Sequence, residues 1–208
     1  MSDKIIINFK PDVLSWRREL VIEPGCLQLH NSSPFSEQPV KWLKEEIESF
    51  RFGVKWIRGT TFYFGRIYCV DIKNKNQQII KIRLKTLYGI NKEILNSKYA
   101  KIVGSLYECY FLPVIQNYCS LFASNKTFEI SGITFHEYGL LLPNNMDILE
   151  WDDVSIKRYQ NYLSIFSTKN PNHYLLFYYN VEWNVLVLEV VIDAILKSKG
   201  NQNVSIYN

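Results

Sequence analysis

Strict alternation of apolar and charged side chains is the strongest pattern in the first half of the chain. In residues 77–85, QQIIKIRLK, apolar side chains alternate with basic ones, and residues 50–56 alternate in the same way. A period of two is typical of antiparallel strands that bury one face and expose the other. We therefore expect largely buried side chains at Phe50, Val54, Trp56, Ile80, Ile82, Leu84, Trp151, Leu163 and Ile165.

Helical spacing of apolar residues marks a further segment in each half. The first begins near Asn91, a suitable N-cap residue, and Pro113 should kink or end it before a second helical piece over residues 114–122. The second helix is predicted from about residue 182 to residue 199. Because this segment is rich in β-branched residues, a buried strand fits it as well, and the residues after Gly200 are interpreted as a tail.

The two halves also read alike in order. An alternating strand turns at Gly25 in the first half and at Gly139 in the second, each two residues after a glutamate. A short acidic step then leads into a long aromatic strand, which starts at Ile47 in one half and at Val154 in the other. The first half has a polar insert between these landmarks. Such self-similarity predicts an internal repeat.

Composition describes an ordinary globular chain with an unusual number of aromatic rings. Of the 208 residues, 47% are hydrophobic, 21% are charged and 15% are aromatic. No apolar run is long enough to span a membrane, and the first residues lack the features of a secretory signal. The four cysteines never form a Cys-x-x-Cys pair, so we interpret them as reduced, buried residues of a cytoplasmic protein.

No catalytic, metal or cofactor motif appears in the sequence. The three histidines have no metal-ligand spacing, and the nine glycines form no phosphate-binding loop. The acidic residues near position 150 lack the alternating ligands and the central glycine of a calcium loop, so we interpret them as a solvated turn. We therefore predict no catalytic residue, no metal and no cofactor, and a protein that is not an enzyme. That acidic cluster consists of Asp147, Glu150, Asp152 and Asp153.

Positive charge is concentrated in the first half. Residues 1–104 carry a net charge of +8, and residues 105–208 carry −4. The strand pattern predicts one basic sheet face, which is our candidate binding surface. Three interpretations of that face are open. It is a solvated surface, a site for an anionic lipid or a nucleic acid, or a contact that the acidic second half covers. Its residues are Arg51, Lys55, Arg58, Lys81, Arg83 and Lys85.

Two short motifs of the second half suggest a family. Residues 137–142, EYGLLL, place an acid-x-Gly turn before a strand, and residues 149–154, LEWDDV, place an aromatic-acid-acid-aliphatic step before the next one. This order resembles the pleckstrin-homology-like fold, and more narrowly the bacterial pleckstrin-homology and GRAM-type domains, in tandem. The resemblance implies an α+β fold of two consecutive antiparallel-sheet (PH-like barrel) units, each closed by a C-terminal helix. We place the first unit at residues 1–125 and the second at residues 126–208.

The resemblance implies binding or scaffolding and carries over no catalytic residue. We expect a non-catalytic module that recognises an anionic lipid headgroup or a protein partner, in the cytoplasm or at the surface of a membrane. The alternatives are a nucleic-acid-binding protein that uses the basic face, and an enzyme without a recognisable motif. Whether the chain forms a homo-oligomer is left open.

Overall fold

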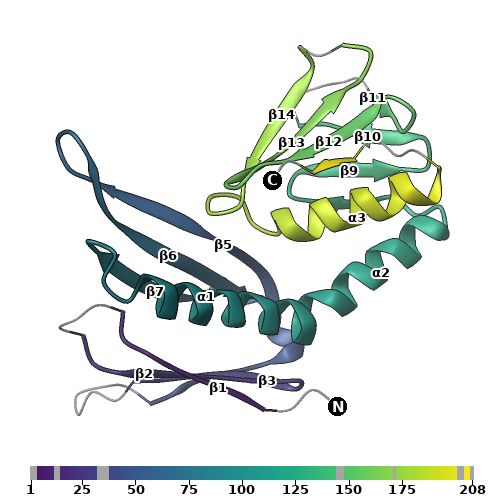
Figure 1. The fold of residues 1–208 in the computed structure, drawn as a ribbon. Helices are drawn as coiled ribbons and strands as arrows, with labels where there is room; N and C mark the ends of the chain where they lie inside the picture. Colours follow the sequence, from purple (N-terminus) through teal and green to yellow (C-terminus); the bar gives the residue numbers. More distant parts are fainter. Residues whose placement is uncertain are drawn as a thin grey trace. The chain divides into compact units, whose positions relative to one another are not determined.

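The computed structural model divides the chain into two compact units, Met1–Leu112 and Pro113–Asn208 (Figure 1). The predicted boundary after residue 125 differs from this division by about the length of one helix. The predicted polar insert, residues 31–39, falls mostly outside the described residues. The structure describes residues 4–11, 15–31, 38–143, 148–170, 172–200 and 204–206.

The first unit begins with a four-stranded antiparallel sheet in the order β1-β2-β3-β4. The predicted turn at Gly25 joins β2 to β3, so that Glu23 pairs with Cys26. Leu20 and Ile22 point to the buried face of this sheet, together with Leu27 and Leu29 of β3. The strands are β1 (Ile5–Phe9), β2 (Arg18–Glu23), β3 (Cys26–Asn31) and β4 (Val40–Leu43).

A separate three-stranded antiparallel sheet follows, with β6 at its centre. A short 3-10 helix, η1 (Lys44–Glu46), leads into it. The predicted strand phase is right for β7, because Ile80, Ile82 and Leu84 are buried. The strands are β5 (Ile47–Arg58), β6 (Tyr63–Asn74) and β7 (Ile79–Leu87).

Burial along β5 decreases towards its far end. Phe50 is buried, Val54 is half-buried, and Trp56 has 46% of its surface exposed. The prediction of a buried Trp56 is therefore wrong. Alternation showed correctly which face Trp56 lies on, but the core beneath that face ends before the strand does.

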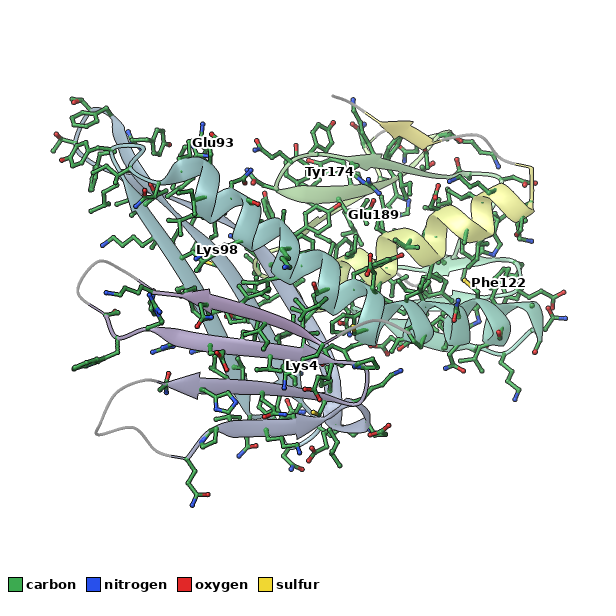
Figure 2. All side chains as sticks on the ribbon, turned by 60° about the horizontal axis from the view of Figure 1, so that its bottom comes forward. Lys4, Glu93, Lys98, Phe122, Tyr174 and Glu189 are labelled. Atoms are coloured by element: carbon green, nitrogen blue, oxygen red, sulfur yellow. The ribbon has the colours of Figure 1, made fainter. Side chains whose placement is uncertain are left out.

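Three consecutive helical segments follow: α1 (Lys92–Leu106), the π-helical turn η2 (Tyr107–Phe111) and α2 (Leu112–Ala123). The π turn ends two residues before Pro113, which has no N–H to donate to the preceding turn, so the predicted irregularity is present. α1 packs against β6, β7 and β1, and Lys98 donates a hydrogen bond from Nζ to the Asn8 carbonyl at 2.7 Å (Figure 2). The rings of Phe111 and Phe50 stack with their centroids 3.6 Å apart.

The second unit contains two more sheets. The first has the order β11-β10-β9-β8 and the second has the order β14-β13-β12-β15. Trp151, Leu163 and Ile165 are buried as predicted. The strands are β8 (Phe128–Ile130), β9 (Ile133–His136), β10 (Gly139–Leu141), β11 (Ile148–Glu150), β12 (Val154–Arg158), β13 (Tyr162–Ser167), β14 (Tyr174–Tyr178) and β15 (Val204–Ile206).

The last part of the chain differs from the expected tail. α3 (Val185–Ser198) is a helix, which decides between the two alternatives that the β-branched run left open. Gly200 follows it with a φ of +79°, as is typical of a residue that ends a helix. Beyond it, β15 pairs in parallel with β12, so residues 204–206 belong to the sheet.

The predicted fold class is wrong in its architecture. The strands form four separate sheets, and among the described residues no ladder joins them into the closed barrels that the resemblance implied. A barrel requires continuous hydrogen bonding around the whole sheet. In the first unit η1 intervenes between β4 and β5, and in the second the turn over residues 151–153 intervenes between β11 and β12. In the first unit four strands, three further strands and α1 follow one another; in the second the same order, β8–β11, β12–β14 and α3, comes after α2 and is followed by β15.

Candidate binding surface of the first unit

Most of the predicted basic residues lie on one face of the β5-β6-β7 sheet. Arg51 and Lys55 are on β5, and Lys81, Arg83 and Lys85 are on β7, with β6 between the two strands. Arg51 and Lys81 both align with Asp71 of β6, and Lys55 and Lys85 both align with Ile67. These five cations form what we call the basic face.

Arg58 does not belong to the basic face. It lies two positions after Trp56 on β5, and alternation therefore places it on the opposite face of the sheet. A register shift at this point pairs Arg58 with Tyr63 and leaves Phe64 as an extra residue on β6. The prediction that grouped Arg58 with Arg51 and Lys55 is wrong for this reason.

One buried carboxylate, that of Asp71, holds two of the cations. Arg51 Nε lies 3.0 Å from Asp71 Oδ2, and Arg83 Nη2 lies 2.6 Å from Asp71 Oδ1. Arg83 also donates from Nη1 to the Ile82 carbonyl at 2.8 Å. Asp71 therefore compensates only part of the positive charge of the two arginines.

The three lysines of the basic face differ from the arginines. Lys55, Lys81 and Lys85 are exposed, and none of them forms an ion pair with another described residue. Residues 49–92 contain ten Lys and Arg but a single acidic residue, Asp71. The face therefore keeps a net positive field that a partner can meet.

Cys69 lies at the centre of this face, in register with Arg83. Burial raises the pKa of the Cys69 thiol, although the nearby positive charges of Arg83 and Lys55 oppose the rise. A raised pKa favours the neutral thiol near pH 7. All four cysteines are free, and only Cys119 is not fully buried.

We predict opposite effects of the Asp71→Asn substitution on stability and on binding. Loss of the carboxylate removes the charge that both arginines contact, and the free energy of unfolding should fall by about 1–2 kcal/mol because the arginines can still reach water. Binding of an anionic partner should become tighter. Urea denaturation and a binding titration measure the two effects.

Glu48→Gln is the matched control, because Glu48 pairs with Lys73 at 3.5 Å and is 42% exposed. We expect that substitution to change stability by no more than about 0.5 kcal/mol. Weaker anion binding by Asp71→Asn, in a variant that remains folded, would contradict the role given to Asp71.

A shallow hollow of about 270 Å³ lies at the far end of the same sheet. Its walls come from the end of the β5–β6 hairpin and from the turn between β7 and α1. Arg66 lies over the Trp56 ring at 4.4 Å from its centroid, and the Tyr63 ring packs edge-on against Trp56 at 5.8 Å. The hollow is lined by Trp56, Phe62, Tyr63, Phe64, Gly65, Arg66, Thr86, Tyr88, Gly89 and Lys92.

Two glycines shape this end of the sheet. A Cβ atom on Gly65 would lie 2.6 Å from the Thr86 carbonyl oxygen, so only glycine allows β6 and β7 to approach so closely there. Gly89 has a φ of +75°, which the turn into α1 requires. Together they hold the hairpin beside the turn that carries Tyr88.

The acidic cluster of the second unit is only partly described, because Asp147 lies outside the described residues. Burial would raise the pKa of Asp153, but hydrogen bonds from Ser167, Thr168 and the Lys169 backbone N–H outweigh burial and lower it. Asp153 is therefore a structural carboxylate that organises its own turn. Within the described residues, no three His, Cys, Asp or Glu side chains are placed to hold a metal ion.

Sequence reasoning missed the aromatic end of the first unit. It assigned Trp56 to the core and did not single out Tyr63 or Tyr88. Two signals were available: residues 59–64, GTTFYF, and residues 88–90, YGI, place large apolar side chains beside glycine in turns, where polar residues are usual.

Comparisons with known proteins add no assignment. No family model, no curated protein and no solved structure matches the chain. The resemblance to pleckstrin-homology-like domains is therefore neither supported nor opposed by a relative. Across the described residues, no helix is both long enough and apolar enough to cross a membrane.

Proposed function

We propose that the protein is a non-catalytic binding module that recognises an anionic partner through the basic face of its first unit. The observation that carries the proposal is the imbalance on that face: three exposed lysines, which form no ion pair with any residue that the structure describes, lie beside two arginines that share one buried carboxylate. An unpaired cluster on a rigid sheet concentrates positive potential.

The arrangement supports recognition of a surface. Lys81, Arg83 and Lys85 occupy every second position of β7, about 7 Å apart in succession, a spacing that suits several separate negative charges. Cys69, at the centre of the face, is held as a neutral thiol. The basic face therefore presents positively charged side chains at fixed positions on a sheet.

The test is charge reversal of two exposed lysines, Lys81→Glu and Lys85→Glu together. We avoid Arg83, because a glutamate there would face Asp71 and disturb the fold. Vesicles containing phosphatidylserine and a fluorescent 20-nucleotide single-stranded DNA serve as probes, each at two salt concentrations. We expect the double variant to bind its probe at least tenfold more weakly at about 0.1 M salt, because both contacts weaken with lost charge.

Lys126→Glu is a control of the same kind outside the basic face, since Lys126 is an exposed lysine of the second unit. It should bind like the wild type. If the wild type binds neither probe, or if the double variant binds as tightly as the wild type, the proposal is wrong.

A further inference from the structure

The end of the first unit exposes an unusual set of apolar side chains. Phe62 and Tyr63 stand on the β5–β6 hairpin, and Tyr88, Ile90 and Ile94 stand on the turn into α1 and on its first helical turn; each is more than half exposed. Together with Trp56 they form what we call the apolar tip. The labelled Glu93 marks the start of α1 at this end of the unit (Figure 2).

The apolar tip does not belong to the core of its own unit. The core face of the sheet is filled by residues nearer the start of β5, such as Phe50, which packs on Phe111. Exposed apolar surface of this kind is costly in water and marks an interaction site. Their hairpin and turn lie side by side because Gly65 allows β6 to approach β7 closely.

Cations surround the apolar tip. Arg66 and Arg58 lie on the Trp56 side of the sheet, and Lys55 and Lys85 lie one residue behind Trp56 and Thr86 on the basic face. Lys92 lines the hollow, and its Nζ lies 3.7 Å from Oε1 of the highly exposed Glu93. The apolar residues therefore form the outermost end of the first unit, and the positively charged residues lie next to them along the strands.

The chemistry of the tip identifies the kind of partner. Nucleic-acid bases stack on rings, but the two isoleucines offer them no such contact. The boundary between lipid headgroups and acyl chains accepts aliphatic side chains, favours Trp and Tyr, and attracts Lys and Arg when the lipids are anionic. The apolar side chains of the tip match the acyl chains, its aromatic rings match the boundary itself, and its basic side chains match the headgroups.

We propose that the apolar tip inserts into the headgroup region of an anionic lipid bilayer, while the surrounding cations and the basic face hold the headgroups. This inference rests on the proposed function and names a membrane surface as the anionic partner. Insertion buries Trp56, Phe62 and Tyr63, and the cations remain at the level of the phosphates.

The test uses the full-length protein and flotation with vesicles of phosphatidylcholine, either alone or with 30% phosphatidylserine. The variant is Phe62→Ser with Tyr63→Ser, whose folding is checked by circular dichroism. We expect its partition onto the phosphatidylserine vesicles to fall at least tenfold. Tyr138→Ser is the matched control, since Tyr138 is 61% exposed, as is Tyr63, but lies in the second unit; it should bind like the wild type.

A second measurement does not depend on removing the tip. Lipids brominated near the headgroup should quench the tryptophan emission of the wild type, and Trp56→Phe should lose most of that quenching. High salt should weaken the serine variant's remaining binding more than it weakens that of the wild type, because only charge attraction is left.

The outcomes separate this inference from the proposed function. If the serine variant binds vesicles like the wild type while Lys81→Glu with Lys85→Glu does not, insertion is wrong and the basic face stands. Binding of single-stranded DNA but not of vesicles also overturns insertion and leaves the proposed function intact. Binding of neither probe by the wild type overturns both.

Discussion

Replacing Ile82 by alanine is expected to lower the free energy of unfolding by about 2–5 kcal/mol. Ile82 lies on β7 and is 1% exposed, in register with the buried Val70 of β6. Alanine would remove three buried carbon atoms and leave a cavity that the surrounding sheet and helix cannot fill completely. Urea denaturation followed by circular dichroism measures the change.

Ile79→Ala provides the matched control on the same strand. Ile79 is 40% exposed and lies on the opposite face, so its replacement should change stability by about 0.5 kcal/mol or less. The pair tests the strand phase directly, because a shift of one residue would exchange the two faces. Equal losses from the two variants, or a larger loss from Ile79→Ala, would show that the phase is inverted.

Replacing Arg158 by alanine is expected to lower the free energy of unfolding of the second unit by about 1–3 kcal/mol, because the Arg158 side chain is 53% exposed whereas its partner is buried. Its guanidinium forms an ion pair with Glu189 of α3, whose residue surface is only 2% exposed. Tyr179 donates its hydroxyl to the same carboxylate at 2.5 Å, and burial raises the pKa of Tyr179 to about 12 despite the opposing charge of Arg158. Without the cation, Glu189 keeps a buried negative charge with only a neutral donor.

Lys169→Ala is the control for this effect. Lys169 lies 3.9 Å from Glu150, and both side chains are more than two thirds exposed. Such a pair contributes about 0.5 kcal/mol or less. If both variants have the same urea midpoint as the wild type, the carboxylate of Glu189, which lies on α3 (Figure 2), must be accessible to water in the folded protein.

The proposed function uses two surfaces of the first unit, the basic face and the apolar tip, and only the first of them can be predicted from the sequence. The basic face follows from alternation, because Lys81, Arg83 and Lys85 occupy every second position of one strand. The apolar tip joins residues from two turns that are more than 20 positions apart, Phe62 and Tyr63 on one side and Tyr88 on the other. Only the folded sheet brings these turns together.

Local patterns determined the elements of this protein. Alternation placed the inward side chains of β7, and helical spacing placed α1 close to its observed start, because both signals depend on residues only a few positions apart. The order of strands and helices in each half follows from the same signals. The weak point was α3, whose β-branched residues suit both a helix and a strand.

The tertiary structure decided what local patterns do not encode. Which strand edges pair is a matter of contacts far apart in the chain, and here they form four sheets rather than closed barrels. Trp56 has the period of a core residue, yet it is exposed because the core ends before β5 does. Asp71 forms ion pairs with two arginines from two other strands only because the ladder aligns them. A one-dimensional pattern reports which face a side chain takes, whereas burial and pairing depend on what the fold places opposite that face.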